Sequence, residues 1–374
     1  MKTRVFLINL GSRKLIFPYA TPPMGLLYLA GYLREKVKDV EIKIVNQRLE
    51  NYTPKEVVKI IYDYYPHILG ISSSTPFAYM IPYIATKIKE LLPQSWIVLG
   101  GPHASAIRKQ AFRDCDKLDI VVPGEGEIAF QLIVESYPDK KSLINIPGLL
   151  WKDDSDLINE NEGILPFEEE LDNLPFPAYD LIDLSKYWEV KSMTLGPCRK
   201  YGSLFSSRGC PYQCMWCHSI FGKKIRFSSP ERIVEEIIWL KNKYEIDNFE
   251  FLDDNFNFNQ LRVFKFAEIV KKKNLKLKLS FPNALRADLI TEEVADALIE
   301  AGTYISSLAL ETGSPRLQKF TCKRLNIPKF LKAVEMMDKR KIYTHGFCML
   351  GFPTETEEEL LQTINVASES KLHT

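Results

Sequence analysis

The sequence has almost no net charge and no long apolar run. Its 49 basic and 48 acidic residues give a formal net charge of +1, so the chain lacks the strongly basic surface expected of a protein that binds nucleic acid. No apolar stretch approaches the roughly 20 residues of a membrane-spanning helix. The opening residues have the pattern of a short strand instead of a signal peptide. We therefore expect a cytoplasmic protein without a membrane span and without a nucleic-acid partner.

Cysteine is also scarce, but three of the seven cysteines are crowded together as Cys210, Cys214 and Cys217. An odd number of cysteines with this crowding favours metal binding in a reducing compartment over disulfides. Three thiolates can hold three irons of a cubane cluster, and no fourth cysteine follows at ligand spacing. Iron–sulfur electron carriers usually hold every iron through the protein. An iron left open can bind a substrate or a cofactor, which indicates an enzyme.

Two alternatives to an iron–sulfur cluster remain open for these cysteines. A structural zinc site takes four ligands, usually in two separated pairs, and Cys198 precedes Cys210 by 12 residues. The second alternative is three buried thiols without a metal. Core packing explains poorly why cysteines so close together are flanked by glycine and proline.

Strand and helix patterns alternate over residues 1–140. This alternation predicts an α/β fold with a parallel, doubly wound sheet. Ligands of such sheets lie beyond the carboxyl ends of the strands, where the loops here are rich in glycine and hydroxyl groups. These loops suit close approach by a large polar ligand. The expected strands cover residues 5–9, 40–45, 68–72, 96–99 and 119–122. The expected helices cover residues 23–36, 77–92 and 125–137, and one more helix is expected to begin at residue 53.

Residues 141–195 differ from both neighbouring regions. A predicted hairpin, with strands at 148–151 and 157–159, precedes an extended, proline-rich connector at 174–177. The domain boundary is therefore expected in this stretch.

Alternation of strands and helices resumes over residues 196–374. Five βα units predict a partial barrel with its site at the carboxyl ends of the strands, and the three cysteines follow the first of these strands. The expected strands cover residues 203–206, 248–252, 276–281, 305–310 and 343–350. The expected helices cover residues 230–244, 260–273, 292–301, 328–339 and 355–370.

The spacing Cys-x3-Cys-x2-Cys, with the aromatic Trp216 before the last cysteine, resembles the radical S-adenosylmethionine (radical SAM) superfamily. The resemblance implies a [4Fe-4S] cluster on Cys210, Cys214 and Cys217, with the open iron chelated by SAM. It also implies reductive cleavage of SAM to a 5′-deoxyadenosyl radical, with the electron supplied by a donor such as flavodoxin or ferredoxin. In such enzymes the protein positions SAM and substrate while the cofactors supply the chemistry. Barrels of the superfamily usually have six βα units, so the sixth is expected to be missing or replaced here.

Other strand ends are similar to SAM-binding elements of the superfamily. Asp253 or Asp254 stands where an acidic residue often holds the SAM amino group, although helix capping by Asp254 or Asn255 is an open alternative. Arg286 is a candidate for the SAM carboxylate, since guanidinium groups pair well with carboxylates. A structural ion pair of Arg286 is equally open.

Two further segments resemble elements near the ribose and the adenine. Glu311 lies in a segment similar to the Glu-Ser-Gly element near the SAM ribose. Gly351 and Pro353 lie in a segment that resembles Gly-x-Pro-Gly-Glu-Thr beside the adenine. This sequence departs from that pattern at Thr354, where the pattern has glycine.

An α/β domain ahead of such a barrel resembles the cobalamin-binding class of radical SAM enzymes, whose flavodoxin-like domain holds a corrinoid. The Asp-x-His-x2-Gly motif that many corrinoid proteins offer to cobalt is absent, and His67 is expected to be packed or exposed. Some relatives keep this domain without binding corrinoid. The resemblance nevertheless implies corrinoid contacts from the strand-end loops, at Ser72, Ser73, Ser74, Thr75, Gly100, Gly101, His103, Gly124 and Glu125.

The resemblance implies methyl transfer to an unreactive carbon or phosphorus of a small-molecule or peptide substrate. Oxidative cyclisation or rearrangement is the alternative within the class, and a zinc-stabilised, non-catalytic binding module is the alternative outside it. Methylthiotransferases also have an α/β domain before the barrel, but that domain carries three cysteines for a second cluster. Residues 1–197 here hold only Cys115, so a second cluster is not expected.

Overall fold

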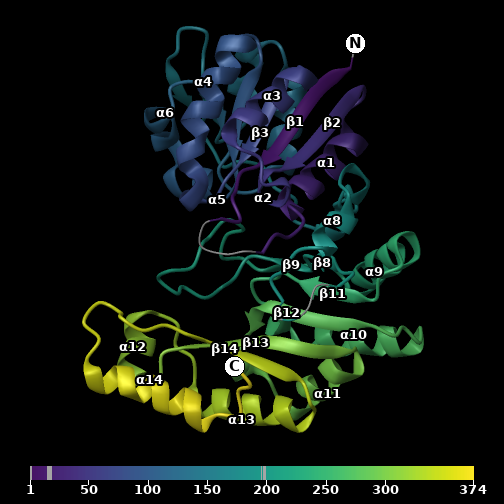
Figure 1. Cartoon of the computed structure of the whole chain (residues 1–374), viewed down its shortest axis with the longest axis vertical. Helices are drawn as coiled ribbons and strands as arrows, with labels where there is room; N and C mark the ends of the chain where they lie inside the picture. Colours follow the sequence, from purple (N-terminus) through teal and green to yellow (C-terminus); the bar gives the residue numbers. More distant parts are fainter. Residues whose placement is uncertain (1, 15–18, 195, 197–198) are drawn as a thin grey trace. The chain divides into compact units, whose positions relative to one another are not determined.

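The computed structural model describes residues 2–14, 19–194, 196 and 199–374. The chain divides into two compact units, Met1–Ser192 and Met193–Thr374, which are described separately (Figure 1). Cys198, the fourth ligand of the zinc alternative, lies outside the described residues.

The first unit is built on a sheet with the strand order β2-β1-β3-β4-β5-β6-β7. Strands β1 to β5 run parallel, and their order, 2-1-3-4-5, is the flavodoxin-like arrangement. The predicted doubly wound parallel sheet is therefore confirmed. The parallel strands are β1 (Thr3–Asn9), β2 (Val40–Asn46), β3 (Ile68–Ser72), β4 (Trp96–Gly100) and β5 (Ile120–Val121).

Helices cover both faces of this sheet (Figure 1). Successive side chains of a strand point to opposite faces, so Phe6 and Ile8 of β1 share a core with α3 and α4. Leu7 points to the opposite face, where its side chain and that of Phe130 of α7 fill the space that a Cβ of Gly70 in β3 would occupy. The helices are α1 (Met24–Lys36), α2 (Gln47–Glu50), α3 (Pro54–Tyr64), α4 (Ile81–Leu91), α5 (Gly101–Ile107), α6 (Ala111–Asp114), α7 (Glu127–Ser136) and α8 (Leu184–Trp188).

Two helix starts differ from the sequence-based expectation. The helix expected over 77–92 is a 3-10 turn, Thr75–Met80, followed by α4 with Pro82 in its first turn, because proline lacks the N–H that a helix interior needs. The strand-end residues 100–105, expected as a loop, begin α5, with Gly100 before its first turn and Pro102 inside it.

The predicted hairpin is present as β6 (Leu150–Lys152) and β7 (Ile158–Glu160). It extends the sheet of the first unit, because β6 pairs antiparallel with β5. The connector that follows also packs on this unit, since the Ala178 amide donates to the Leu27 carbonyl of α1 at 3.0 Å. Residues up to Ser192 therefore belong to the first compact unit.

The second unit is a five-stranded parallel sheet in the order β14-β13-β12-β11-β8. Helices follow the strands in βα units, which confirms the predicted partial barrel. The strands are β8 (Gly202–Leu204), β11 (Asn248–Phe251), β12 (Lys278–Leu285), β13 (Thr303–Glu311) and β14 (Tyr343–Cys348). The helices are α9 (Pro230–Tyr244), α10 (Gln260–Lys272), α11 (Glu292–Glu300), α12 (Pro315–Phe320), α13 (Ile327–Lys339) and α14 (Glu357–Glu369).

Each of these six helices begins at a polar cap. The side chain preceding the helix accepts a hydrogen bond from a backbone N–H of the first turn, which would otherwise lack a partner. The caps are Ser229, Asn259, Thr291, Ser314, Asn326 and Thr356. This local chemistry explains why five of the six helix starts agree closely with the sequence-based expectation, whereas the short α12 was not predicted.

The last residues of the chain lie along the outer edge of β14. The His373 amide donates to the Thr344 carbonyl at 3.0 Å, and the Gly346 amide donates to the Thr374 carbonyl at 2.7 Å. These hydrogen bonds occupy part of the outer edge of β14.

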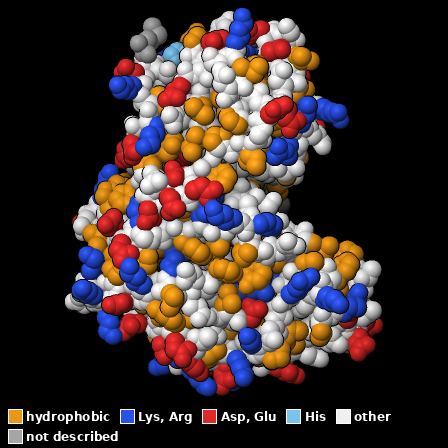
Figure 2. All heavy atoms as spheres, turned by 180° about the vertical axis from the view of Figure 1, so that it is seen from behind, with side chains coloured by type: hydrophobic (Ala, Val, Ile, Leu, Met, Phe, Trp, Pro, Cys, Tyr) orange, Lys and Arg blue, Asp and Glu red, His pale blue; other side chains and the backbone are white. Residues whose placement is uncertain are grey.

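Within the described ranges, no helix combines the length and apolarity needed to cross a membrane. On the face drawn in Figure 2, basic and acidic side chains are interspersed over both units. This agrees with the small net charge of the sequence.

Glu236 of α9 is a buried carboxylate that forms a long ion pair with Arg232. It is 5% exposed, and Arg232, the cation nearest to it among the described residues, lies 3.5 Å away. Burial raises the pKa of Glu236 from 4.5 to about 7. The folded chain therefore holds a proton that the unfolded chain releases, and the free energy of unfolding falls as pH rises through this window.

We expect Glu236→Gln to remove this pH dependence. The variant should exceed the parent in free energy of unfolding by about 1–3 kcal/mol near pH 8 and by little near pH 4. Urea denaturation across this pH range measures the difference. The matched control is Glu235→Gln, which changes an exposed neighbour on the same helix. An equal effect of both substitutions at all pH values would contradict the assignment.

Candidate active site

The cysteine loop is enclosed by a short hairpin that the sequence did not predict. Its strands, β9 (Ser207–Arg208) and β10 (Arg226–Phe227), pair antiparallel just after β8. Gly209 has φ +90°, and a Cβ there would lie 2.4 Å from the Lys224 carbonyl oxygen. Only glycine fits this backbone, so Gly209 sets the path of the chain into Cys210.

The three cysteines differ in exposure and in the pKa of their thiols. Cys214 is buried, Cys210 is half-buried and Cys217 is exposed. A hydrogen bond from Cys217 lowers the pKa of Cys214 to about 6, helped by the charges of Lys323 and Arg286. The same hydrogen bond raises the pKa of Cys217. The shared hydrogen bond therefore favours the thiolate, the form that binds metal, at Cys214.

Within the described part of the chain, no three His, Cys, Asp or Glu side chains are gathered closely enough to share one metal ion. A cubane cluster does not require such convergence, because each cysteine binds a different iron. The three thiols lie on one loop, which suits a cluster held through three of its irons.

Asp253 and Asp254 follow β11 but face different partners. The Asp253 carboxylate, 3% exposed, accepts hydrogen bonds from the Ser206 amide at 3.1 Å, the Ser206 hydroxyl at 2.8 Å and the Ser207 hydroxyl. Burial raises the pKa of Asp253. Asp254 lies 3.2 Å from Nε2 of His218. Asp253 thus anchors β9, the strand that leads into the cysteine loop. Asp254 contacts the far end of that loop at His218, the residue after Cys217.

Asn255 is a functional candidate that sequence reasoning treated only as a helix cap. It precedes the 3-10 turn Phe256–Phe258, but its side chain makes no capping hydrogen bond. The residue is 3% exposed, and its Oδ1 has no hydrogen-bond partner among the described residues. A buried acceptor without a donor is costly, so this atom suits a bound ligand that donates a hydrogen bond.

Arg286 holds the cysteine loop against the strand ends. Its guanidinium pairs with Asp288 through two contacts, of 2.7 and 3.2 Å. This is the ion pair that the sequence left as an alternative. The same group lies 3.7 Å over the ring of Tyr212 in the cysteine loop and donates to the Lys323 carbonyl at 3.1 Å. A role for Arg286 toward the SAM carboxylate stays a prediction.

Lys323 was missed by the sequence analysis, because no motif marked it. Its ammonium lies 3.3 Å from the Glu311 carboxylate, and both side chains are nearly buried, at 13% and 11% exposure. The turn containing Lys323 contacts the cysteine loop, since the Met215 amide donates to the Thr321 carbonyl at 3.1 Å. The structure thus places the Lys323–Glu311 ion pair beside the cysteines.

The Gly351–Pro353 segment lies beyond β14, as predicted. Gly351 has φ +86° with no atom within 4 Å of a Cβ position, and Glu355 accepts hydrogen bonds from the Gly351 and Phe352 amides. Thr354 has φ +68°, which explains why the similar family pattern has glycine there. The Arg316 guanidinium donates to the Thr354 carbonyl at 2.8 Å and helps to hold this strained residue.

The predicted loops of the first unit meet at the carboxyl ends of β3 and β4. Ser72 and Gly100 are paired across the two strands. Gly101 has φ +81°, and a Cβ there would lie 2.5 Å from the Ser72 hydroxyl. Ser105 joins these loops to the β5 loop, because its hydroxyl donates to the Gly101 carbonyl and accepts from the Gly124 amide, both at 2.9 Å.

His103 lies in the same group of loops but is turned toward the protein. It is 8% exposed, its amide donates to the Ser73 carbonyl, and its Nδ1 lies 3.2 Å from the Thr75 hydroxyl. Burial lowers the pKa of His103, which keeps the ring neutral. His67 is packed, as expected: its Nδ1 accepts from the Arg4 amide at 2.9 Å, and its ring stacks on Tyr137.

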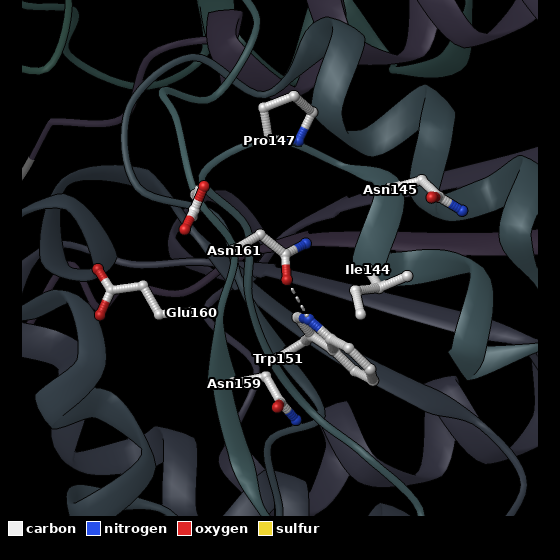
Figure 3. Close-up of a pocket in the computed structure, with 8 residues that line it drawn as sticks. Ile144, Asn145, Pro147, Trp151, Asn159, Glu160 and Asn161 are labelled. Carbon is white, nitrogen blue, oxygen red and sulfur yellow. Dashed lines mark hydrogen bonds between the residues drawn. The ribbon is translucent and has the colours of Figure 1, made fainter.

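A hollow of about 480 Å³ lies beside the β6–β7 hairpin (Figure 3). Trp151 donates its indole N–H to Asn161 at 2.9 Å, and Asn161 in turn donates to two backbone carbonyls. Asn159 and Glu160 line the same hollow. None of the residues predicted to contact a cofactor lines it, so the strand-end loops remain the candidate site of this unit.

Comparisons with known proteins agree with both halves of this description. The radical SAM superfamily model matches residues 204–367, and the B12 binding domain model matches residues 16–134. An uncharacterized methyltransferase, PH0819, of Pyrococcus horikoshii is 33% identical over 92% of this chain and 73% of its own length. Cytidylyl-2-hydroxyethylphosphonate methyltransferase of Streptomyces wedmorensis is 26% identical over 94% of this chain and 74% of its own.

The fold also matches that of the cobalamin-dependent S-adenosylmethionine radical enzyme OxsB, with a TM-score of 0.79 at 20% identity. The match covers 98% of this chain and 52% of OxsB. The chain therefore belongs to the radical SAM superfamily, among the members in which a B12-binding domain precedes the radical SAM domain.

Proposed function

We propose that this protein is a cobalamin-dependent radical SAM methyltransferase. The observation that carries the proposal is the cysteine loop itself: Cys210, Cys214 and Cys217 lie on one glycine-anchored loop at the carboxyl ends of a parallel partial barrel. The relatives named as methyltransferases support methyl transfer as the reaction. When bound, the cluster supplies one electron for cleaving SAM, and cobalamin carries the methyl group.

The residues around the cysteines fit SAM chemically. Asn255 offers a buried acceptor that no donor among the described residues reaches, which suits the SAM ammonium. Lys323 offers a nearly buried cation beside the cysteines, which suits the SAM carboxylate. Glu311 is then the candidate contact of the SAM ribose, and the turn at Gly351 is the candidate contact of the adenine. These residues bind and orient SAM and exclude water from the cleavage site.

The loops at β3, β4 and β5 fit a large polar ligand such as cobalamin. Ser72 and Ser74 are half-buried at the strand ends, so their hydroxyls can reach a bound molecule. A Cβ at Gly100 would meet only one atom within 4 Å, the Val122 carbonyl oxygen at 3.8 Å. His103 is engaged with Thr75, so we assign it to the loop and the corrinoid tail instead of cobalt.

Anaerobic reconstitution tests this proposal. We expect the purified full chain, supplied with iron, sulfide and hydroxocobalamin, to retain about one cobalamin per chain and to release 5′-deoxyadenosine from SAM under dithionite. One zinc per chain with no SAM cleavage would contradict the proposal and favour the non-catalytic module. Transfer of the SAM methyl group into product distinguishes methylation from cyclisation or rearrangement of a small-molecule or peptide substrate.

A further inference from the structure

Tyr212 is a half-buried aromatic residue of the cysteine loop and lies between Cys210 and Cys214. The Arg286 guanidinium lies over its ring, 3.7 Å from the ring centroid. This is well inside the roughly 6 Å within which a cation is attracted to an aromatic face. The Arg286 side chain is only 7% exposed, so water screens this attraction little, and the contact belongs to the stronger interactions of its kind.

Arg286 is held in place by contacts that do not involve Tyr212. Its Nε and Nη2 atoms pair with Asp288, and Nη2 also donates to the Lys323 carbonyl at 3.1 Å. Its backbone is fixed by the buried Asn257, which accepts from the Arg286 amide and donates to the Arg286 carbonyl, both at 2.9 Å. The edge of the guanidinium is thus used in hydrogen bonds, while its face supports the ring of the cysteine loop.

Tyr212 connects this support to a cysteine. Its ring meets the ring of Phe258 edge-on, with 6.3 Å between the ring centroids. Its carbonyl accepts a hydrogen bond from the Lys223 ammonium at 2.9 Å, and its amide donates a hydrogen bond to the Cys210 sulfur. A displacement of the Tyr212 ring from Arg286 would therefore also displace the backbone that contacts Cys210.

We propose that Tyr212 is a positioning residue, which fixes Cys210 and Cys214 for the cluster by stacking on Arg286. This inference rests on the proposed function, which includes a cluster on this loop. Arg286 then acts on the cysteines through Tyr212, whereas the resemblance to the superfamily offered Arg286 as a partner of the SAM carboxylate. The two roles of Arg286 differ in one consequence, because only the positioning role requires the aromatic ring at Tyr212.

Hydrogen exchange of the metal-free full chain tests the positioning role without the cluster. The amides of Met215 and Cys217 report on the loop, because each donates to a backbone carbonyl at 3.1 Å. We expect Tyr212→Leu to speed their exchange by about tenfold and Tyr212→Phe, which keeps the ring, to leave it within about twofold. Exchange over β13 is the folding control and should be the same in every variant.

The coupling between the two residues is measured by adding Tyr212→Leu to Arg286→Gln. Loss of the cation already removes the stacking contact, so the second substitution should add less than about twofold to the exchange rate. Independent effects of the two substitutions, which would multiply in the double variant, would overturn the proposal. An unchanged exchange rate in Tyr212→Leu would overturn it as well.

SAM cleavage by the reconstituted chain gives the second measurement. With dithionite as reductant, Tyr212→Leu and Arg286→Gln should each slow cleavage by about 10–100-fold and to similar extents. A loss confined to Arg286→Gln would show that Arg286 acts on SAM directly and would overturn the positioning role. Absence of cleavage by the parent chain would instead contradict the proposed function. The exchange measurements need no cluster, so the two failures are distinguishable.

Discussion

Replacing Cys214 by alanine is expected to abolish cluster assembly and SAM cleavage. Cys214 is the buried member of the three cysteines, and its thiol has the lowered pKa that favours the metal-binding thiolate. Loss of residues that only support a metal ligand commonly costs 10–100-fold, so loss of the ligand itself should exceed about 100-fold in 5′-deoxyadenosine formation. Iron content and visible absorbance after reconstitution measure assembly, and product analysis measures the rate.

The matched control is Cys115→Ala. Cys115 is also buried, at 4% exposure, but it lies in the apolar core of the first unit. Its replacement should leave the iron content and the SAM cleavage rate near those of the parent. If Cys214→Ala kept its full iron content and the parental rate, the assignment of the cluster to this loop would be wrong.

Replacing Asp253 by alanine should destabilise the second unit strongly. The carboxylate accepts three hydrogen bonds from Ser206 and Ser207, and its charge is balanced by the nearby Arg262, which is 6% exposed. Removing the carboxylate leaves these buried donors without their acceptor, which costs about 1–3 kcal/mol for each group left unsatisfied. We expect a loss of this size in the free energy of unfolding, together with faster hydrogen exchange over residues 204–208.

Asp254→Ala is the control for this prediction. Asp254 is the adjacent carboxylate, but it is partly exposed and pairs with His218, which is half exposed. Exposed ion pairs contribute about 0–1 kcal/mol, so the loss of stability should be small. Equal losses of stability in both variants would show that Asp253 does not anchor the cysteine loop.

Local patterns predicted the repeating part of this fold well. The βα units of the second unit follow from apolar strands and from helix caps such as Ser229 and Thr291, whose chemistry acts within a few residues. The crowded cysteines indicated a candidate site for the same reason, since a single loop carries all three.

Features that depend on contacts between distant segments could not be predicted. The β9–β10 hairpin pairs residues separated by the whole cysteine loop. Lys323 became a candidate only when folding placed it beside Glu311 and the cysteines. Asn255 became a candidate because its oxygen is buried and has no donor within the described part of the chain. Pairing and burial of this kind have no signature in local sequence.

Electron paramagnetic resonance of the reconstituted, dithionite-reduced protein tests the central claim most directly. We predict the signal of a reduced [4Fe-4S] cluster whose g values change when SAM is added, because SAM would bind the iron that Cys210, Cys214 and Cys217 leave open. A cluster signal that ignores SAM, or bound zinc in place of iron, would contradict this prediction.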